Sequence, residues 1–355
     1  MINAVFAFSL LMSYLAVHIS PGIFVLPAFF GLAYPYLLLV NIILVITWAA
    51  LLKYEALISI VVIAFGLTHF SNYIKLRKPV GNKKDTFKVL SYNLRLFNYF
   101  ENNSNDISEK KVLEFLKTQD PDILCLQEFF VLGDPLRKGK EIKRILGSGY
   151  YSHMKVIGSG KNRAYGIATF TKYPIIRRGE IIHPKSSSLS IYSDVLIQND
   201  TFRIYNNHLQ SFRLRRMERS FIEEIAAPED KEPINGIRNL SVNLKKGFAI
   251  RAVQSQVVKE HINRSPVPVI VIGDFNDTPV SYSYRKIRKG LHDSFVDSGY
   301  GAGFTYKGKY PPNRIDYILY DDALISRYFE IIKVKYSDHY PIIAYFRKNT
   351  KKEGF

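Results

Sequence analysis

The hydrophobic and polar positions divide the chain into two unequal parts. From Ile2 to Phe70 aliphatic and aromatic residues dominate, and only Lys53 and Glu55 carry a formal charge. A hydrocarbon layer ~30 Å thick requires about 20 apolar residues per helix. The stretch is therefore long enough for about three transmembrane helices. We expect them at Ile2–Ile19, Ala28–Leu51 and Ala56–Tyr73.

The charges beside this apolar stretch predict its orientation. The loop between the first two expected spans has no basic residue, whereas several follow the last span: Lys75, Arg77, Lys78, Lys83 and Lys84. The positive-inside rule then places the rest of the chain in the cytoplasm, in a multi-pass protein of a bacterial inner or plasma membrane. Three alternatives remain. In the first, the initial span is a cleaved signal peptide. In the second, only two spans exist and the N-terminus lies on the other side of the membrane. In the third, the long segment after the spans crosses the membrane regardless of its charge.

After residue 85 the pattern changes to short apolar runs that end in polar residues, which is typical of buried strands followed by turns. One run leads into Asn93, a second into Gln127-Glu128, and a third stops at Gly273 and leads into Asp274 and Asn276. Because residues two apart on an extended segment face the same side, Asp274 and Asn276 are expected to point together. The sequence thus predicts polar groups at the ends of several buried strands.

The remaining pattern predicts helices and loops around these strands. Amphipathic spacing predicts helices over Ser108–Thr118 and about Leu244–Asn263. Residues 177–192 are interpreted as a loop followed by an edge strand. The polar and basic segment Ser211–Asn243 is the longest insertion between motifs, and insertions of this size often select substrate or cover a site.

The strand-terminal residues suit one kind of chemistry. A phosphate ester resists water because its anionic oxygens repel nucleophiles, so an enzyme must neutralise that charge, deprotonate a water molecule and stabilise the leaving oxygen. Amide and carboxylate oxygens such as those of Asn93 and Glu128 suit Mg²⁺ or Mn²⁺. Asp274 can accept the proton of the attacking water, and Asn276 can hold a phosphate oxygen or the water itself. Arg314-Ile315-Asp316-Tyr317 and Ser337-Asp338-His339 add an imidazole and a carboxylate that can orient it.

Each residue alone also has a purely structural interpretation. A strand-terminal Asn or Glu is most often a turn former, and a lone His339 is compatible with a hydrogen-bonded core histidine. An apolar strand that ends in Gly273-Asp274-Phe275-Asn276-Asp277 is more specific, because such a strand rarely ends in two acids and an amide without a ligand to hold. The combination of complementary groups in one region favours catalysis.

The ordered set of motifs resembles the endonuclease/exonuclease/phosphatase superfamily, which includes exonuclease III, deoxyribonuclease I, neutral sphingomyelinases, inositol polyphosphate 5-phosphatases and deadenylases. The resemblance covers about residues 86–348. It rests on Asn93, Gln127-Glu128, Asn206-Asn207-His208-Leu209, Gly273-Asp274-Phe275-Asn276, Arg314-Ile315-Asp316 and Ser337-Asp338-His339. It implies an α/β fold, a four-layered α/β sandwich of two packed mixed sheets with helices outside.

The resemblance also implies a role for each matching residue. Asn93, Glu128 and Asp338 would bind or approach a catalytic Mg²⁺, with Mn²⁺ as an alternative. Asp274 and Asn276 would position and deprotonate the water, while Asp316 would orient His339 against the scissile phosphate. The remaining candidates are His208 as a second phosphate histidine, Tyr165 as a catalytic tyrosine or a packing residue, and Asn206 and Arg314 as substrate contacts. The chain has Asn207 where Thr is common in the family.

Composition completes the prediction. We expect a membrane anchor over 1–75, a basic linker over 76–85, a catalytic domain over 86–348 and a basic tail over 349–355. The formal net charge of +18 favours a phosphate-bearing partner, although it would also suit an anionic membrane surface or a merely solvated basic face. The single cysteine, Cys125, lies in an apolar run and excludes an intrachain disulfide.

The expected function is therefore a membrane-anchored, divalent-metal-dependent phosphoesterase. Nucleic acid or phospholipid is the expected substrate, and no obligate protein partner is predicted. A nuclease and a sphingomyelinase-like or inositol-phosphatase-like lipid phosphohydrolase remain open. A membrane-tethered binding protein that kept the fold and lost the chemistry is the third alternative, which the retention of every proposed ligand disfavours.

Overall fold

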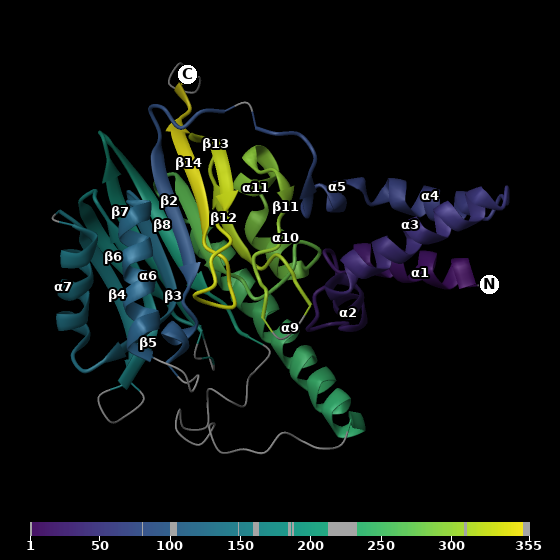
Figure 1. The fold of residues 1–355 in the computed structure, drawn as a ribbon, viewed down its shortest axis with the longest axis horizontal. Helices are drawn as coiled ribbons and strands as arrows, with labels where there is room; N and C mark the ends of the chain where they lie inside the picture. The colour runs from purple at the N-terminus through teal and green to yellow at the C-terminus, as the bar shows by residue number, and fades with distance from the viewer. Residues whose placement is uncertain are drawn as a thin grey trace.

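The computed structural model consists of a layered α/β body from which a narrow helical bundle projects (Figure 1). The structure describes residues 2–79, 81–99, 105–147, 149–158, 163–183, 186, 188–211, 233–308 and 311–350. The N-terminus lies at the far end of the bundle, and the chain enters the body after α5 (Figure 1).

Two six-stranded sheets form the centre of the body. Sheet I has the order β13-β14-β2-β3-β5-β4, and sheet II the order β10-β12-β9-β8-β7-β6. Each is mixed, because β2 pairs in parallel with β3 in sheet I and β8 with β9 in sheet II, while the other pairs are antiparallel. The strands of sheet I are β13 (Leu324–Ile331), β14 (Ile342–Lys348), β2 (Phe87–Asn93), β3 (Ile123–Leu132), β5 (Arg163–Thr171) and β4 (Tyr151–Gly158). The strands of sheet II are β10 (His292–Asp293), β12 (Asp316–Tyr320), β9 (Val269–Asp274), β8 (Asp200–His208), β7 (Leu189–Ile197) and β6 (Ile175–Ile181).

Helices cover the outer face of each sheet, so that the body has four layers. α6 (Asn105–Gln119) and α7 (Pro135–Leu146) lie on sheet I, and α9 (Pro233–Asn263) and α10 (Tyr282–Arg288) lie on sheet II (Figure 1). The short elements η1 (Arg95–Asn98) and α11 (Ser294–Ser298) follow β2 and β10. Apolar side chains fill all three interfaces: one cluster joins sheet I to its helices, one joins the two sheets, and one joins sheet II to α9 and α10. This confirms the predicted arrangement of two mixed sheets flanked by helices.

The N-terminal bundle contains α1 (Ile2–Leu15), α2 (Leu26–Leu32), α3 (Tyr34–Ala50), α4 (Ala56–Phe65) and α5 (Leu67–Phe70). These helices are shorter than the three spans expected from hydropathy, because turns interrupt them after Leu15, at Ala33 and at Gly66. Among the described helices, none is by itself both long and apolar enough to cross a bilayer. The pair α2 and α3 meets that length and composition together but bends by 69° at its break.

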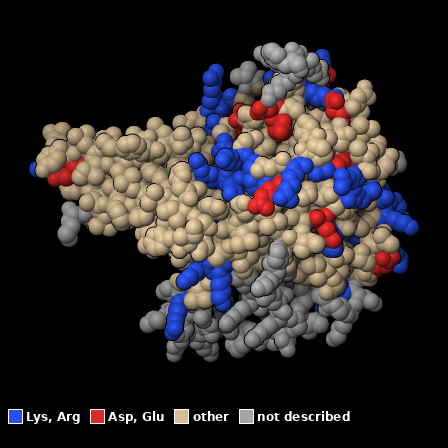
Figure 2. Space-filling model, turned by 180° about the vertical axis from the view of Figure 1, so that it is seen from behind, with Lys and Arg blue, Asp and Glu red and all other residues tan. Residues whose placement is uncertain are grey.

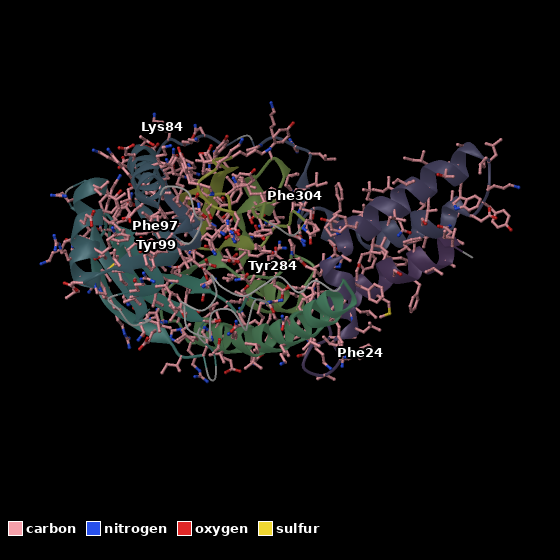
Figure 3. The ribbon with its side chains drawn as sticks, turned by 60° about the horizontal axis from the view of Figure 1, so that its bottom comes forward. Phe24, Lys84, Phe97, Tyr99, Tyr284 and Phe304 are labelled. Carbon is pink, nitrogen blue, oxygen red and sulfur yellow. The ribbon has the colours of Figure 1, made fainter. Side chains whose placement is uncertain are left out.

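The base of the bundle is packed directly onto the body. A short strand β1 (Ile74–Lys75) pairs with β11 (Gly301–Ala302), and the buried Arg314 donates a hydrogen bond of 2.8 Å to the carbonyl of Asn72. A Cβ added at Gly31 in α2 would lie 2.3 Å from the carbonyl oxygen of Val280, so only glycine permits this approach. The bundle and the body therefore share one interface, which Phe304 approaches from the side of the body (Figure 3).

Most predicted elements are observed, and two predictions are wrong. The predicted helix over Ser108–Thr118 is α6, and the one at Leu244–Asn263 is the last part of the longer α9. Residues 177–181 belong to the edge strand β6 rather than to a loop, and β7 is an internal strand; exposed Arg177 and Arg178 on β6 are typical of a protected sheet edge. Of the predicted insertion Ser211–Asn243, residues 212–232 lie outside the described residues and 233–243 begin α9.

Candidate active site

Strand ends from both sheets converge on one place. In sheet I, Asn93 at the end of β2 is in register with Gln127 of the parallel strand β3, one residue before Glu128. In sheet II, His208 at the end of β8 is in register with Asp274 of the parallel β9. The antiparallel neighbour β12 places Asp316 opposite Asp274. Because the carboxyl ends of neighbouring parallel strands share an edge, the polar strand ends predicted from the sequence lie side by side.

Unusual backbone conformations direct two of these side chains. Glu128 has φ +46° at the point where the register of β3 against β5 shifts, which is a β-bulge that turns the side chain out of the regular alternation. Gly273 has φ +135°, and a Cβ there would lie 1.9 Å from the carbonyl oxygen of Asn207. The glycine before Asp274 is therefore required by contact with β8, and Asn276 at φ +51° completes the sharp turn.

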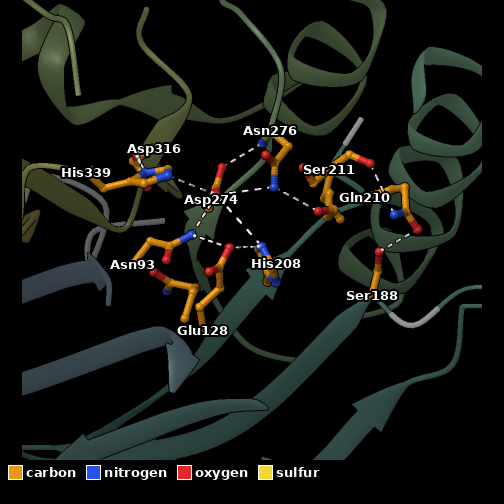
Figure 4. A network of polar contacts seen from close by, with 12 residues as sticks. Asn93, Glu128, Ser188, His208, Gln210, Ser211, Asp274, Asn276, Asp316 and His339 are labelled. Carbon is orange, nitrogen blue, oxygen red and sulfur yellow. Dashed lines mark hydrogen bonds and ion pairs between the residues drawn. The ribbon is translucent and has the colours of Figure 1, made fainter. Parts of the chain in front are cut away.

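Asp274 lies at the centre of the polar network (Figure 4). Its Oδ2 accepts hydrogen bonds from the side-chain amides of Asn93 at 2.9 Å and Asn276 at 3.2 Å. Its Oδ1 accepts a 2.7 Å bond from the backbone N–H of Asn276. Burial and the nearby negative charge of Asp316 raise the pKa of Asp274 to about 6. The carboxyl group can thus accept a proton near neutral pH.

His339 is held by Asp316, as the sequence predicted. The Nδ1 of His339 lies 2.9 Å from one oxygen of Asp316 and 3.2 Å from the other. Although burial opposes a positive charge, Asp316 and Asp274 raise the pKa of His339 to about 10. The Nε2 of the ring lies 3.8 Å from Asp274 and 4.0 Å from Asp338. A protonated imidazole in this position can donate a hydrogen bond to an anionic oxygen in the pocket.

Glu128 and His208 face each other on the other side of Asp274. The Nε2 of His208 lies 3.4 Å from Glu128 and 3.9 Å from Asp274, and it is buried without a hydrogen-bond partner among the described residues. Burial opposes ionisation of Glu128, but the contact with His208 and the charges of His208 and His339 lower its pKa to about 2. Glu128 raises the pKa of His208 above its ordinary value despite burial. Each member of the pair therefore favours the charged form of the other.

A cavity of about 120 Å³ opens beside this network and is lined by Glu128, Asn276, Asp338 and His339 together with residues that the sequence did not single out. Arg95 forms a 3.4 Å ion pair with Asp338, and the ring of Tyr306 packs edge-on against His339 at 5.3 Å between centroids. A third lining residue that the sequence did not single out is Leu32 of α2, which belongs to the N-terminal bundle. No motif predicts these three, because each reaches the cavity from a loop or from a distant segment.

The donor groups suit a divalent cation. Glu128 and Asp338 line the cavity. The side-chain nitrogen of Asn93 lies 3.4 Å from Glu128, and its amide oxygen accepts a hydrogen bond from the backbone N–H of Arg95. Carboxylate and amide oxygens are ligands of the kind that Mg²⁺ prefers. A second set, Asp274, Asp316 and His339, has ligand atoms within 4.8 Å of one another. In that set the Nδ1 of His339 is already bonded to Asp316, so the group around Glu128 fits an ion better. The four carboxylates of the two sets supply the negative charge that a cation requires.

Three predicted residues lie elsewhere. Asn206 is fully buried between the sheets: it accepts a 2.8 Å hydrogen bond from Gln127 and donates to the carbonyls of Leu126 and Ala168. Arg314 is 1% exposed and both its terminal nitrogens are used within the protein, one by Asp293 and one by the Asn72 carbonyl. Tyr165 belongs to the apolar core of sheet I. The structure gives Asn206 and Arg314 structural roles in place of the predicted substrate contacts, and favours packing for Tyr165.

The chain belongs to the Endonuclease/Exonuclease/phosphatase family, whose model matches residues 90–339. The members of this family are hydrolases that act on phosphoesters and typically depend on divalent metals, and the predicted resemblance is thereby confirmed. Residues 1–73 match the model of a domain of unknown function (DUF8431).

Individual relatives agree with this assignment. Protein angel of Drosophila melanogaster is 25% identical over 283 residues, which cover 71% of this chain and 72% of that protein. The human Nocturnin catalytic domain with bound sulfate anion has a similar fold, with a TM-score of 0.54, 19% identity, and coverage of 77% of this chain and 100% of that one. D. rerio TDP2 complexed with single strand DNA product matches with a TM-score of 0.52, 16% identity, and coverage of 75% and 100%.

Proposed function

We propose that the chain is a membrane-anchored, divalent-metal-dependent phosphodiesterase with nuclease-like chemistry. One observation carries the proposal: Glu128, Asp338 and His339 line a single small cavity, directly beside the buried pair Asp274 and Asp316. A binding protein on the same fold has no need of a carboxyl group with a raised pKa next to an oriented imidazolium.

The residues divide the work as follows. Asn93, Glu128 and Asp338 would hold the cation, which when bound neutralises phosphate charge and lowers the pKa of water. Asp274 accepts the proton of the attacking water, and Asn276 fixes the orientation of Asp274 through two hydrogen bonds. His339, kept protonated by Asp316, donates to a phosphate oxygen, and His208 does the same through its Nε2, which lies 3.4 Å from Glu128.

Two classes of substrate are candidates: a nucleic acid and a phospholipid. The basic surface of the body and the similarity of the fold to a protein complexed with single strand DNA product favour a nucleic acid. Leu32 favours a phospholipid as the alternative, because this residue brings the apolar bundle to the wall of the cavity. An inositol phosphate belongs with the second candidate, since it is released from the same lipids.

Membrane anchoring is supported by the inverted polarity of the bundle. Its interior holds a network of polar side chains: the hydroxyl of Ser59 lies 2.7 Å from the side-chain oxygen of Asn3 and 2.9 Å from that of Asn41, and Asn41 donates to the carbonyl of Phe6. Its surface instead presents large apolar side chains, and Figure 2 shows it without Lys, Arg, Asp or Glu except at the far end. Polar contacts between helices with an apolar exterior are typical of helices packed in lipid.

The orientation proposed from the sequence keeps the catalytic body on the cytoplasmic side of a bacterial inner or plasma membrane. The charged tip with Lys53 and Glu55 would then reach the opposite surface. The only tryptophan, Trp48, lies near that end of α3 and provides a native reporter. In vesicles of phosphatidylcholine brominated on its acyl chains, the fluorescence of Trp48 in the full chain should be quenched; unquenched emission would contradict the membrane proposal.

Glu128 provides the decisive test of the catalytic proposal. In the full chain with Mg²⁺, Glu128→Gln should lower the turnover of bis-p-nitrophenyl phosphate at least 100-fold, because it removes a charged ligand without changing the side-chain volume. Removal of metal with EDTA should abolish activity, and added Mg²⁺ or Mn²⁺ should restore it. The matched control is Glu114→Gln on the exposed face of α6, which should leave turnover unchanged. Full activity of the Glu128→Gln protein would refute the assignment.

A substrate panel separates the two candidates. The wild-type chain is incubated with single-stranded DNA, RNA, sphingomyelin and phosphoinositides. If nucleic acid is the substrate, the affinity of the inactive Asp274→Asn protein for an oligonucleotide should fall steeply with salt. A flat salt response together with release of phosphate or headgroup from vesicles would favour the lipid.

A further inference from the structure

A second pocket lies where the bundle meets the body, away from the candidate active site. Its volume is about 460 Å³, and no Asp or Glu is among the described residues that line it. The two pockets share no lining residue. Thr278 lines the active-site cavity, and its neighbour Pro279 lines the second pocket. The basic and imidazole side chains of its wall are Arg285, Lys286, Arg288, Lys289, His18 and His69. We call it the junction pocket.

No ion pair joins a basic side chain of the junction pocket to a carboxylate among the described residues, although the charge of Arg288 helps to lower the pKa of the buried Asp293. Arg288 donates hydrogen bonds of 2.8 Å to the side-chain oxygen of Asn72 and to the hydroxyl of Tyr284, and both partners are neutral. The buried carboxylate of Asp293, which accepts from Tyr284, is already paired with Arg314. Figure 2 shows Lys and Arg side chains gathered on the body beside the base of the bundle. The pocket therefore has the charge of an anion-binding site.

Apolar side chains are exposed on the two helices whose C-terminal ends precede the histidines of this pocket. On α1 and α4, which pack against each other, exposed apolar side chains repeat at spacings of three and four residues, so that they form one stripe along each helix. Each stripe runs toward the body and is followed, three or four residues after its last member, by one of the two histidines of the pocket. The stripes consist of Phe8, Leu11 and Leu15 on α1, and of Ile58, Val61 and Phe65 on α4.

We propose that the junction pocket binds the phosphate of an anionic phospholipid headgroup, whose acyl chains lie along the two stripes. The proposal rests on the membrane part of the proposed function and is independent of the catalytic part. Basic residues close to a membrane surface attract anionic lipids, and Arg forms charge-assisted hydrogen bonds with phosphate. A nucleic acid phosphate would meet the same charges, but it has no group to place on apolar stripes. The pocket would fix the height of the bundle in the membrane and thus the distance of the active site from the lipid surface.

The test uses short-chain lipids and the full chain in a neutral detergent. Dihexanoyl phosphatidylglycerol, dihexanoyl phosphatidylcholine, inorganic phosphate and an oligothymidylate are titrated in EDTA, and binding is followed by calorimetry. The variant is Arg285→Glu with Lys289→Glu, since both residues are exposed. The matched control is Lys245→Glu with Lys246→Glu on the exposed face of α9, which makes the same change in net charge.

Phosphatidylglycerol should bind the wild-type and control proteins at least tenfold more tightly than phosphatidylcholine does, and the Arg285→Glu, Lys289→Glu protein should lose that preference. Equal affinities for inorganic phosphate and phosphatidylglycerol would overturn the lipid assignment. The same conclusion would follow if the double substitution weakened the binding of oligothymidylate but not that of phosphatidylglycerol. Hydrolysis of bis-p-nitrophenyl phosphate is measured separately on the same protein preparations, with Mg²⁺ and without EDTA. A protein that shows the lipid preference without hydrolysis disproves the catalytic proposal alone, and the reverse result disproves only the junction pocket.

Discussion

At the scale of single residues, the backbone around Asp274 leaves no room for substitution. Gly273 has both a left-handed φ and a carbonyl oxygen where a Cβ would lie. Gly273→Ala should therefore destabilise the protein by roughly 3 kcal/mol or more, because strain and overlap with β8 add together. Urea unfolding measures the loss. Gly290→Ala is the control, since its φ is also positive but no atom lies within 4 Å of the added carbon; a loss equal to that of Gly273→Ala would contradict the contact argument.

The raised pKa of Asp274 predicts a pH-dependent stability. A folded-state pKa of about 6 lies above that of an exposed carboxyl, so the stabilisation from the bound proton is present below about pH 4 and is lost as the pH rises through 6. Asp274→Asn stays neutral, so its stability relative to wild type should increase by up to about 3 kcal/mol between pH 4 and pH 7.5. Urea unfolding in EDTA measures the difference. A relative stability that is independent of pH would contradict the raised pKa, and exposed Glu114→Gln should show no such trend.

The residues predicted from the sequence differ from the observed set for a physical reason. Asn93, Glu128 and Asp274 lie within about two residues of the end of an apolar run, whereas His339 lies shortly before the apolar strand β14, and the ends of a buried strand are positions that the sequence reveals. Arg314 likewise lies two residues before a strand, β12, yet its charge is neutralised by Asp293, which is 21 residues distant and carries no recognisable motif. Whether a strand-terminal group faces a cavity or a buried partner depends on side-chain packing, which a local pattern does not encode.

At the scale of elements, α2 is the unexpected component of the active site. The sequence assigned this region to a transmembrane span, whereas the structure turns it by 69° against α3 and places Leu32 in the wall of the catalytic cavity. The apolar pattern predicted the stretch, and Pro27 and Pro35 lie in the first turns of α2 and α3, where proline begins a helix, whereas Gly66 at the later interruption is itself compatible with an apolar helix. The location of the turns depends on contacts of α2 with the body, such as that of Gly31 with Val280.

The position of Leu32 predicts an effect on substrate binding. In a cavity of about 120 Å³, Leu32→Trp should raise the KM for bis-p-nitrophenyl phosphate several-fold while it changes kcat less, because Leu32 is an apolar wall residue that carries no group able to bind the metal or transfer a proton. Steady-state kinetics measure both constants. Leu26→Trp on the same helix is exposed and should change neither. An unchanged KM in the Leu32→Trp protein would show that α2 does not limit access to the cavity.

At the scale of the whole molecule, the bundle and the catalytic body behave as one structural unit. The body supplies Val280 and Phe304 to the apolar core of the bundle. The bundle in turn supplies hydrogen-bond acceptors to the body. The carbonyl of Tyr73 accepts from the N–H of Gly303. The carbonyl of Asn72 accepts from Arg314, and its side-chain oxygen accepts from Arg288. Sequence reasoning divided the chain near residue 75, because composition changes there. Composition does not reveal that Arg314 and Arg288 of the body donate hydrogen bonds to acceptors that lie before that boundary.

This interdependence predicts that the catalytic domain suffers when the bundle is removed. A chain of residues 76–355 loses the acceptors of Arg314 and Arg288 and exposes Val280, so its unfolding midpoint should fall by on the order of 10 °C relative to the full chain in the same detergent. Its KM should also rise, because the cavity loses the wall formed by Leu32. Thermal unfolding and steady-state kinetics check the two effects.

Asn72→Ala in the full chain is the matched control for this truncation. It removes the side-chain acceptor of Arg288 but keeps the backbone carbonyl that Arg314 requires, so its midpoint should fall by only a few degrees and its KM should stay unchanged. A truncated protein with the midpoint and KM of the full chain would mean that the body is independent of the bundle. In that case the contacts at Asn72, Tyr73 and Gly31 would contribute nothing to either stability or catalysis, and the bundle would serve as an anchor alone.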